Sequence, residues 1–518
     1  MGAMYRVPLT NTIGAEGMGL YQMVFPVYTV LLAFCGGGIS SAVSRVVAKY
    51  TARGDEVTAV RTVRVAAVPV AVISVISTAA VILLRDGISR IQGNPEAALC
   101  YLALAPSLVF AGLTSVFRGY FQGKNKMLPS GVSQLIEQSA KLFLSLYLSR
   151  VFLAFGVRYA VAGALLGITV GEVVSLLYLF VRYALTKKSR RESAVAVRKA
   201  SVRPLFEIAS DGFFVTDKTL GKEIAAVAFP ITLGSLILPL TQLIDSALII
   251  NLLMRSGAGR LEATELFGLF VGPVGTLINM PTVILASVTV AFLPALTAET
   301  ERGGDGGRMT RLVAEFVMMF VIPVATAFLL FPESICGALY RRGLTEEQLS
   351  VASRLLRVQA VSVLYAGIYQ VFATVLQVRG KAHRPVVNLA IGGAVKVALT
   401  PLLVMTVGIE GGAAATAACY AVAALLTARA ACKAAPVGVS AVKAFVMPTA
   451  FSAAGAVAFY GVTFVMNAVA ISQFFKTALA AGAFFVVYAA GMFFCGAVKI
   501  GALFKGRNAA NQNREKIS

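Results

Sequence analysis

Long runs of apolar residues with few charges follow one another along the whole chain, and they constrain its fold more than any other feature. Of the 518 residues, 58% are hydrophobic and only 14% are charged, and the mean hydropathy is +0.80. A soluble domain carries about 25% charged residues, so it has enough polar surface to cover its core. A bilayer instead accepts apolar surface and requires about 20 residues for each crossing helix. The composition therefore predicts an all-α, multi-pass membrane protein.

Thirteen of these runs are long enough to be membrane-spanning helices. Their predicted ranges are 18–44, 65–84, 97–117, 128–149, 157–181, 224–251, 266–296, 312–332, 355–378, 385–408, 410–428, 444–466 and 477–498. Proline interrupts several of them, as at Pro26, Pro69, Pro230 and Pro239. In lipid, such interruptions are tolerated where neighbouring helices or a cavity satisfy the freed backbone groups. The pattern therefore predicts bent helices around a central space.

The net charge of +22 arises mainly from basic clusters in alternate loops. About 32 of the 46 Lys and Arg residues lie in seven regions, which are 45–64, 118–126, 182–222, 302–311, 379–384, 429–443 and 499–516. The positive-inside rule places these loops and the C-terminus in the cytoplasm. Nucleic-acid binding would require basic and aromatic residues on one soluble surface, whereas anionic membrane lipids can neutralise basic loops. We therefore expect a bacterial inner-membrane protein that binds no nucleic acid.

Residues for catalysis and for metal binding are scarce in this chain. His383 is the single histidine, and none of the six cysteines forms a C-x-x-C pair. These counts argue against a histidine-based metal site and against Ser-His or Cys-His catalysis. The sequence also lacks the G-x-x-x-x-G-K-[ST] loop that binds ATP phosphates. We therefore expect neither enzyme activity nor a cofactor.

Two pairs of similar segments recur at an offset of about 250 residues. Residues 19–34 resemble residues 266–281, and residues 121–148 resemble residues 376–403. Both members of each pair lie on the same predicted side of the membrane, so the repeats are parallel. Transporters are often built from duplicated halves around a midplane site. The alternative is chance similarity among apolar helices. The shared offset and the shared topology of the two pairs argue against it.

The repeats suggest how the chain is organised. We predict an N-terminal lobe at residues 1–184 and a C-terminal lobe at 222–431. A hydrophilic cytoplasmic connection at 185–221, too short to form a domain, joins the lobes. Two additional helices occupy 432–498, and a basic cytoplasmic tail follows at 499–518.

Three sequence runs carry a resemblance to a known family. They are IGAEGMGLYQMVFPVYTVLLAFCGGGISSAVSRVVAKY, FRGYFQGKNKMLPSGVSQLIEQSAKL and AFPITLGSLILPLTQLIDSALI. They resemble the polysaccharide-transporter and stage V sporulation protein B group of the multidrug/oligosaccharidyl-lipid/polysaccharide (MOP) exporter superfamily, which includes the MurJ-type lipid II flippases. The resemblance implies two pseudo-symmetric six-helix lobes, two extra C-terminal helices and a cavity that opens alternately to either side. It also implies a substrate with a sugar or muropeptide headgroup on a polyprenyl diphosphate.

The N-terminus departs from the pattern of this family, in which a complete first helix precedes the outward loop. Here only MGAMYRVPLTNTIG stands in its place. We expect a truncated or misassigned start, and a restored first helix would bring the count to fourteen. Arg6 would then be the remainder of a helix whose cationic residues line the cavity in MurJ-like proteins.

Because the implied headgroup is anionic, buried cations are the candidate residues that bind it. A charge at the bilayer centre costs several kcal/mol unless it is compensated. Lys141 and Lys396 occupy matching positions in the repeats, 12 and 11 residues after the prolines that open their helices. That spacing is about 17 Å along the axis, close to the midplane, so the two lysines are expected to face one cavity from opposite lobes.

Each of these cations has an alternative interpretation. Glu137 lies one helical turn before Lys141 and either shares the cavity site or merely neutralises the lysine. For Lys396, the alternative is snorkelling to the membrane interface. Arg45 and Arg118 are further candidates for the headgroup, but they lie nearer the cytoplasmic ends of their helices. There, positive-inside anchoring explains them equally well.

Isolated polar residues on two predicted helices suggest a coupling site for Na⁺ or a proton. Asp245 follows Thr241 on the helix that Pro230 and Pro239 break, and a broken helix with a carboxylate suits such an ion. The segment LTQLIDSALI also resembles the region that carries a cation-associated aspartate in MurJ-like proteins. Asn388 and Thr400, on the helix of Lys396, are further candidate partners in this site. The alternative for Asp245 is an interfacial carboxylate.

Glu172 is a further isolated charge within a predicted span. We interpret it as a bridging residue and assign it no more specific role. The charges and the resemblance together favour a flippase or exporter of a polyprenyl-diphosphate-linked saccharide, with lipid II as the first candidate. A cation-coupled multidrug antiporter would share the architecture, but carboxylates and aromatic side chains should dominate its cavity. A scaffold for cell-wall synthesis proteins would need no buried charge. The two midplane lysines favour the anionic cargo.

Overall fold

The structure is a computed structural model, and it describes residues 2–200, 216–301, 307–434, 440–468 and 471–495. Within these ranges the chain forms seventeen α-helices and no strand. Twelve helical segments of the described chain are long and apolar enough to cross a membrane. The remaining predicted span is helix α6 (Met127–Phe152), which is more polar but reaches about 39 Å at 1.5 Å per residue. The twelve segments and α6 coincide with the thirteen predicted runs.

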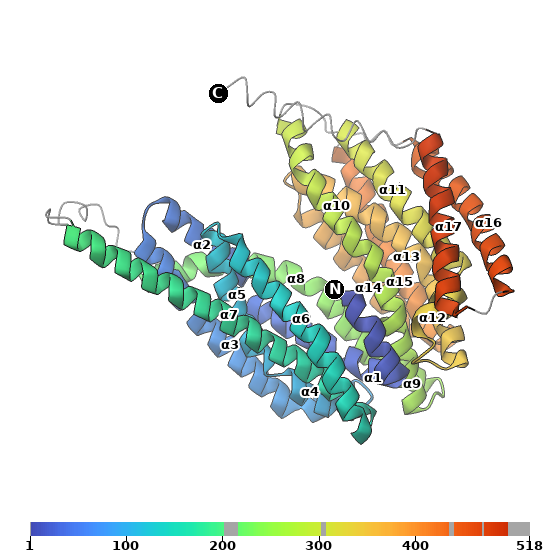
Figure 1. Cartoon of the computed structure of the whole chain (residues 1–518), viewed down its shortest axis with the longest axis horizontal. Helices are drawn as coiled ribbons and strands as arrows, with labels where there is room; N and C mark the ends of the chain where they lie inside the picture. The colour runs from blue at the N-terminus through green and yellow to red at the C-terminus, as the bar shows by residue number, and fades with distance from the viewer. Residues whose placement is uncertain (1, 201–215, 302–306, 435–439, 469–470, 496–518) are drawn as a thin grey trace. The chain divides into compact units, whose positions relative to one another are not determined.

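By their contacts, the residues form two compact units, Met1–Pro273 with Thr400–Ile409, and Val274–Leu399 with Glu410–Ser518. The other helices of the first unit are α1 (Gly2–Leu32), α2 (Ile39–Ala52), α3 (Glu56–Ile91), α4 (Ala97–Leu104), α5 (Ser107–Gly123), α7 (Val157–Ala200), α8 (Asp217–Arg255) and α9 (Arg260–Leu269) (Figure 1). The helices of the second unit are α10 (Gly275–Glu301), α11 (Gly307–Leu330), α12 (Pro332–Tyr340), α13 (Glu346–Val378), α14 (His383–Val407), α15 (Ile409–Ala434), α16 (Met447–Asn467) and α17 (Gln473–Phe494). The part of α14 from Thr400 onward groups with the first unit. Helix α8 thus groups with the first unit, and the predicted lobe boundary at residue 222 stays a prediction.

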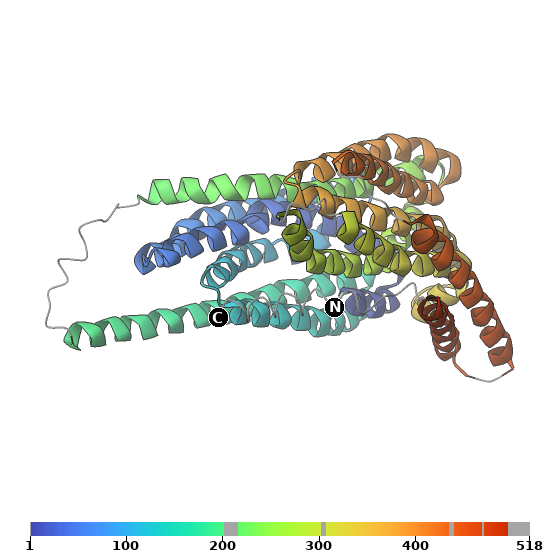
Figure 2. The ribbon, with the colours of Figure 1, turned by 90° about the horizontal axis from the view of Figure 1, so that it is seen from above.

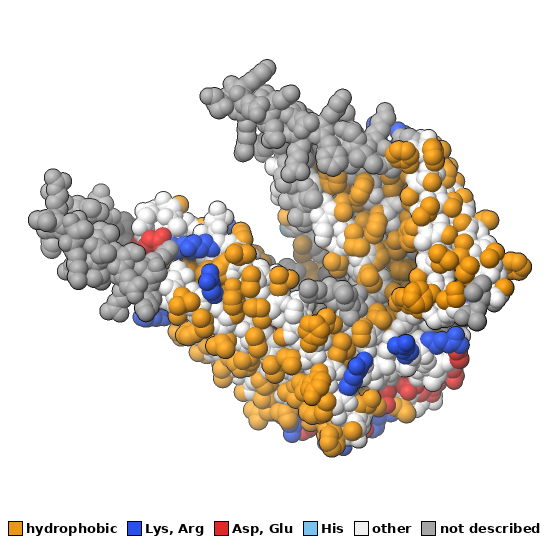
Figure 3. Space-filling view, viewed as in Figure 1, with side chains coloured by type: hydrophobic (Ala, Val, Ile, Leu, Met, Phe, Trp, Pro, Cys, Tyr) orange, Lys and Arg blue, Asp and Glu red, His pale blue; other side chains and the backbone are white. Residues whose placement is uncertain are grey.

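Large apolar side chains are exposed on both units. Leu83 and Phe143 of the first unit are 80% and 70% exposed, and Phe464 of the second is 82% exposed. Hydrophobic side chains cover most of the helix surfaces visible in Figure 3. In water, a continuous apolar surface of this kind would drive association, whereas lipid tails solvate it. The chain is therefore a multi-pass membrane protein.

The N-terminal segment is helical and continuous with the first predicted span. Helix α1 contains one break, at Gly14, whose φ of 69° lies in the left-handed region. Glycine adopts this conformation without a steric penalty because it has no Cβ. A helical segment thus lies on each side of Gly14, and the expectation of a truncated first helix stays a prediction. The segment before Gly14 carries Arg6, and α1 as a whole packs against α6, α7, α8 and α9.

The predicted connection at 185–221 is partly helical. Helix α7 continues to Ala200, and α8 begins at Asp217, while residues 201–215 lie outside the described ranges. Residues 185–200 contain no Gly or Pro and are rich in Ala, Lys and Arg, which favour helix. The helix therefore continues past the end of its apolar part, as the long ribbon of α7 in Figure 2 shows.

The second pair of sequence repeats has the same backbone geometry in both copies. The turn between α5 and α6 and the turn between α13 and α14 each contain a left-handed residue, Asn125 (φ 55°) or Gly380 (φ 71°). In both turns the next residue, Lys126 or Lys381, donates its amide to the carbonyl five residues earlier, which is the Schellman cap of a helix end. The two turns are 255 positions apart (380 − 125 and 381 − 126). This geometry supports a structural repeat.

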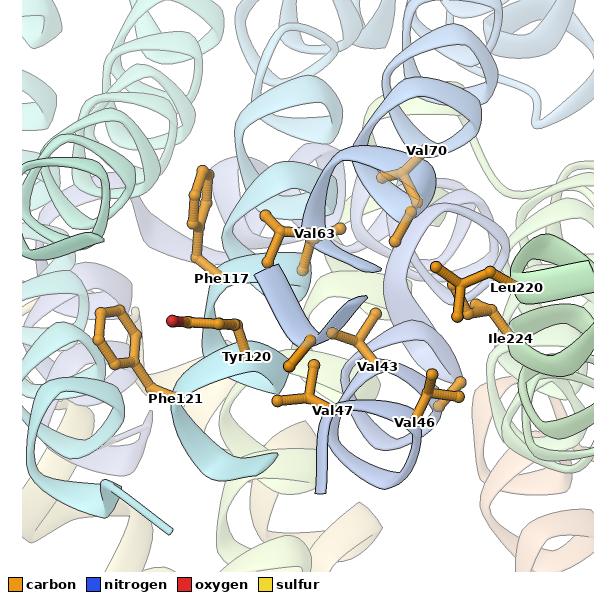
Figure 4. Packing of buried hydrophobic residues seen from close by; sticks show 14 of the residues in the cluster. Val43, Val46, Val47, Val63, Val70, Phe117, Tyr120, Phe121, Leu220 and Ile224 are labelled. Carbon is orange, nitrogen blue, oxygen red and sulfur yellow. The ribbon is translucent and has the colours of Figure 1, made fainter. Parts of the chain in front are cut away.

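A core of aliphatic and aromatic side chains joins α2, α3, α5 and α8. Figure 4 labels ten of its members, which are Val43, Val46, Val47, Val63, Val70, Phe117, Tyr120, Phe121, Leu220 and Ile224. Next to this core, Lys49 Nζ contacts Glu223 Oε1 at 2.7 Å, and Arg61 Nε contacts Asp217 Oδ1 at 2.5 Å. Burial and ion pairs together hold the first turns of α8 against α2 and α3.

Candidate functional site

The first unit contains a cavity of about 630 Å³, and every residue that lines it belongs to this unit. Helices α1, α2, α5, α6, α7 and α8 and the π-helical turn Ala33–Gly37 contribute residues to it. Its charged lining residues are Arg6, Arg118, Glu137, Lys141 and Glu172. The volume lies within the range of about 300 to 1,000 Å³ that is typical of ligand sites. Four of the five charges contact one another.

Arg118, Glu137, Lys141 and Glu172 form a buried ion-pair network across α5, α6 and α7. The Lys141 Nζ atom lies 2.5 Å from Glu137 Oε1 and 3.0 Å from Glu172 Oε1. Arg118 Nη2 lies 2.7 Å from the other carboxylate oxygen of Glu137. The side chains of Glu137 and Glu172 are only 8% and 5% exposed. Buried charges of this kind are tolerated because each has a partner of opposite sign.

Two serines complete the hydrogen bonding of this network. Arg118 Nε donates to Ser133 Oγ at 2.9 Å, and its Nη2 donates to Ser175 Oγ at 3.2 Å. Ser175 Oγ in turn donates to the Ser133 carbonyl at 3.2 Å. Arg118 is therefore fixed to α6 by an ion pair and a hydrogen bond and to α7 by a second hydrogen bond. Arg118 thus lines the cavity but is engaged by Glu137 and two serines, and its predicted contact with a headgroup stays a prediction. Glu137 pairs with Lys141, as the spacing of one helical turn predicted.

Close packing of α6 on α7 brings the network together, and the two helices run side by side in Figures 1 and 2. Gly163, Gly167 and Gly171 form a G-x-x-x-G-x-x-x-G motif on α7. A Cβ atom on Gly167 would lie 2.4 Å from the Ser145 backbone nitrogen, and one on Gly171 would lie 3.2 Å from the Glu137 carbonyl oxygen. Small residues at such spacing allow membrane helices to approach closely. This motif was not predicted from the sequence, although its spacing is visible there.

Arg6 lines the same cavity but has a different environment. Its guanidinium lies 5.8 Å from the centre of the Phe25 ring, a cation–π contact. No carboxylate lies within ion-pair distance of Arg6 in the part of the chain that the structure describes. Its charge is therefore available to an anion in the cavity, whereas the charge of Lys141 is shared by two carboxylates.

Three aromatic residues of α1, namely Tyr21, Phe25 and Tyr28, also line the cavity, and we call them the aromatic wall. The Tyr21 and Phe25 rings stack at a centroid distance of 5.5 Å and an angle of 16°, and Phe25 and Tyr28 lie 6.0 Å apart. Their spacing of four and three residues places them on one helix face. These residues were not predicted from the sequence, because aromatic residues do not stand out in an apolar run; only their helical spacing was a signal.

The remaining predicted cations lie elsewhere. Arg45 is exposed on α2 and is absent from the lining of the cavity. Lys396, on α14, is 8% exposed and belongs to the second unit. Its burial is inconsistent with snorkelling to an interface, because a snorkelling lysine exposes its ammonium group. The prediction that Lys396 faces one cavity together with Lys141 stays a prediction.

The predicted coupling residues are divided between two helices. Asp245 is 7% exposed on α8, with Thr241 one turn before it. Asn388 and Thr400 lie 12 residues apart on α14, a separation of about 18 Å along the helix, so one ion cannot bind both. Asn388 Nδ2 instead donates to Thr427 Oγ1 at 3.2 Å. No group of three or more His, Cys, Asp or Glu that could hold a metal occurs in the described ranges.

Comparison with known proteins identifies the family. The model of the family described as polysaccharide biosynthesis protein matches residues 1–298. The chain is 29% identical to stage V sporulation protein B of Bacillus subtilis (strain 168) over 305 residues, which are 58% of this chain and 56% of that protein. The chain thus spans about half the length of this curated relative. It is also 23% identical to the lipid II flippase MurJ of the same organism, over 81% of this chain and 77% of that protein.

A solved structure shows the same fold. The lipid II flippase MurJ in an inward closed conformation superposes with a TM-score of 0.69 at 14% identity, over 95% of this chain and 96% of that chain. At this identity the likeness establishes the arrangement of helices alone. It confirms the expected fold class, and the family match confirms the resemblance seen in the sequence. The chain belongs to the polysaccharide biosynthesis protein family.

Proposed function

We propose that this protein is a flippase that moves a polyprenyl-diphosphate-linked saccharide across the bacterial cytoplasmic membrane by alternating access. The observation that carries the proposal is the cavity of about 630 Å³ with Arg6 in its lining. A diphosphate cannot cross hydrocarbon without compensation for its charge. A cavity within a membrane bundle provides such compensation when it holds an arginine that has no carboxylate partner among the described residues.

The charge balance of the cavity supports an anionic cargo. Arg6, Arg118 and Lys141 contribute three positive charges, and Glu137 and Glu172 contribute two negative charges, which leaves one net positive charge. Within the network, Arg118 and Lys141 are already neutralised by the two carboxylates. The excess charge is therefore that of Arg6, whose guanidinium matches phosphate oxygens in geometry as well as in sign.

Lipid II is the substrate that we favour. The curated relative with the longer alignment is named as a lipid II flippase, and its solved counterpart has the same fold. Another polyprenyl-linked oligosaccharide is the alternative within the same class. Membrane lipids would surround the protein, and proteins of cell-wall synthesis would be its partners. Coupling to Na⁺ or to protons would involve Asp245, which is buried on α8.

A cation-coupled antiporter of small molecules is the second candidate. It is favoured by the two carboxylates, Glu137 and Glu172, and by the aromatic wall, because carboxylates and aromatic rings attract organic cations. Against it, Lys141 and Arg118 hold both carboxylates. Arg6 lies over Phe25 and would repel a second cation from that ring.

Reconstitution distinguishes the two candidates. The protein is placed in liposomes with lipid II, and the access of an added enzyme to the headgroup in the outer leaflet is measured over time. We expect the rate of exposure to exceed that of protein-free liposomes and to fall in the variant Arg6→Gln. No acceleration by the wild-type protein would reject lipid II as the substrate. Uptake of a fluorescent organic cation against an ion gradient would instead favour the antiporter.

A further inference from the structure

The two buried carboxylates that share Lys141 differ in how well their charges are compensated. Glu137 contacts the Lys141 ammonium at 2.5 Å and the Arg118 guanidinium at 2.7 Å. Glu172 contacts Lys141 at 3.0 Å, and no second cation lies within ion-pair distance of it among the residues that the structure describes. The charge of Glu172 is therefore compensated by a single lysine, which a second carboxylate also contacts.

Few titratable groups surround Glu172. Helices α1, α4, α5 and α6 and the short turn Leu153–Phe155 pack against α7. The titratable or charged side chains that face Glu172 from these elements are Tyr28 of α1, Arg118 of α5, and Glu137 and Lys141 of α6. Helix α4 carries Cys100, which contacts the Arg158 carbonyl, and Tyr101, which donates to Gln92. Arg158 lies 14 residues (172 − 158) before Glu172 on α7, or about 21 Å along the axis. The turn carries no titratable side chain.

An anion in the cavity would compete with Glu172 for the ammonium group. The Lys141 side chain is 20% exposed, and Lys141 and Glu172 both line the cavity. A phosphate on this ammonium would bring a third negative group to a lysine that already contacts two. Glu137 would keep Arg118 as its partner, whereas Glu172 would keep no cation. A buried carboxylate in that position is stabilised by taking up a proton, because the neutral carboxyl group has a much smaller desolvation penalty.

The charge balance leads to the same expectation. With both carboxylates ionised, the network of Arg118, Glu137, Lys141 and Glu172 has no net charge. A proton on Glu172 gives it one positive charge in addition to that of Arg6, and the proposed substrate carries a negative charge on each of its two phosphates. On the basis of the proposed function, we propose that Glu172 takes up one proton from solvent when an anionic phosphate lipid binds to Lys141.

The alternative role for Glu172 is a permanently ionised member of a structural network. Stability alone is a weak reason for four buried charges, because apolar side chains of similar volume often stabilise a protein as well or better. A structural role also does not require the ammonium group to be accessible from a cavity, as that of Lys141 is. The two roles differ in a measurable way, since a permanently ionised Glu172 makes lipid binding independent of its protonation.

The first test measures how the affinity for anionic lipids depends on pH. Lipid II and phosphatidylglycerol are the probes, because the phosphates of both are disubstituted and do not titrate near neutral pH; diacylglycerol is the control without phosphate. Dissociation constants are measured on the full chain in detergent from about pH 8 to about pH 5.5. Because binding takes up one proton, the affinity for an anionic lipid should rise by up to about tenfold for each unit by which the pH falls.

Two matched amide variants assign this dependence to one carboxyl group. Glu172→Gln should bind the anionic lipids with an affinity that no longer changes with pH, because the amide is neutral throughout. Glu137→Gln should keep the dependence, because it leaves Glu172 intact. A wild type without pH dependence for either anionic lipid, failure of both lipids to bind, or a Glu172→Gln protein with the wild-type dependence would overturn the proposal.

Calorimetry counts the protons directly. Isothermal titration in buffers of different ionisation enthalpy should give close to one proton per lipid for the wild type and none for Glu172→Gln. Asp245→Asn should keep the wild-type value, because equilibrium binding in detergent involves no ion gradient and is separate from the coupling predicted for Asp245. Proton uptake that persists in Glu172→Gln and disappears in Glu137→Gln would assign the proton to Glu137 and refute its assignment to Glu172.

A third measurement needs no lipid. The double variant Lys141→Gln/Glu172→Gln should regain most of the thermal stability that Lys141→Gln loses, because the remaining Arg118 and Glu137 still form a pair. Lys141→Gln/Glu137→Gln should not regain it, since Glu172 and Arg118 are then both unpaired. The destabilisation by Lys141→Gln should also shrink as the pH falls, because Glu172 can then be neutral. Recovery with Glu137→Gln instead of Glu172→Gln would contradict the proposal.

The two lipids separate this proposal from the proposed function. If phosphatidylglycerol binds with proton uptake at Glu172 and lipid II does not bind, the proton site stands and lipid II is rejected as the substrate. If lipid II is flipped in liposomes while wild type and Glu172→Gln bind it with the same pH dependence, the proton site is rejected and the flippase proposal stands.

Discussion

The Lys141 ammonium lies 3.0 Å from the Glu172 carboxylate, although 31 positions separate the two residues and they belong to different helices. The same ammonium lies 2.5 Å from Glu137. Lys141 was the leading candidate for an anionic headgroup on sequence grounds, yet two carboxylates already neutralise it. Arg6, which the sequence placed in a remnant of a helix, is the cation of this cavity that has no carboxylate partner among the described residues.

Removal of the Lys141 charge should destabilise the protein strongly. Lys141→Gln leaves Glu172 buried without a charged partner, and breaking a buried ion pair in this way costs about 3 to 5 kcal/mol. The thermal unfolding of detergent-purified protein measures the effect. Lys49→Gln is the control, because its pair with Glu223 is 40% and 30% exposed and contributes about 1 kcal/mol or less. Similar shifts of the unfolding temperature in both variants would contradict a structural role for the network.

Loss of the Arg6 guanidinium should impair transport while leaving folding intact. We expect Arg6→Gln to lower the rate of headgroup exposure in liposomes about tenfold or more, because a charge-assisted hydrogen bond to phosphate contributes about 1.5 to 3 kcal/mol. Arg6→Lys should retain part of the rate, since it keeps the charge but loses the bidentate geometry. Arg45→Gln is the comparison, because Arg45 is exposed outside the cavity. If Arg45→Gln impairs transport as much as Arg6→Gln, the assignment to Arg6 fails.

A single methyl group on α7 should disturb the network from a distance. Gly167→Ala places Cβ 2.4 Å from the Ser145 backbone nitrogen, so α6 and α7 must separate, at a cost of about 1 to 3 kcal/mol. The variant Gly131→Ala, on α6, has no atom within 4 Å of the new Cβ and should be neutral or slightly stabilising. Unfolding temperatures of the two variants test this difference. Equal stability would show that the helices do not depend on the glycine contact.

Asp245→Asn should abolish any dependence of transport on Na⁺ or on a proton gradient, because the amide carries no charge to exchange. The test compares flipping rates of wild type and variant at several Na⁺ concentrations and pH gradients. Asp245 is buried on α8, so an unfolding measurement accompanies the assay. An ion dependence that persists in a folded Asp245→Asn protein would remove this residue from the coupling site.

Lys396→Gln should cripple function without reducing expression, if Lys396 contributes to the transport pathway. The lysine is 8% exposed on α14, so its loss removes a buried charge from the second unit. Growth complementation, with membrane expression measured in parallel, provides the readout. Full complementation by the variant would exclude Lys396 from the substrate site.

The sequence predicted some features of the site and not others, for a physical reason. Glu137, Lys141 and Glu172 were found because a charge in an apolar run is costly and therefore conspicuous. Tyr28 and Phe25 were missed, because an aromatic residue in an apolar run carries no free-energy penalty in the membrane and therefore does not stand out. Glu172 was identified as an isolated charge, but its partner lies on another helix, and no local pattern reveals such a partner.

The fold divides in the same way. The sequence by itself determined that the chain crosses the membrane many times, since hydropathy depends on each segment alone. It also marked the repeated turns, where Asn125 and Gly380 provide the left-handed residue. Only the tertiary structure decided which charges in the cavity are neutralised and which one remains available. The reason is that the interaction between two charges depends on the distance between the helices that carry them. The close approach of α6 and α7 at Gly167 brings Lys141 within reach of Glu172. Arg6 lies in the part of α1 before the break at Gly14, and its side chain lines the cavity.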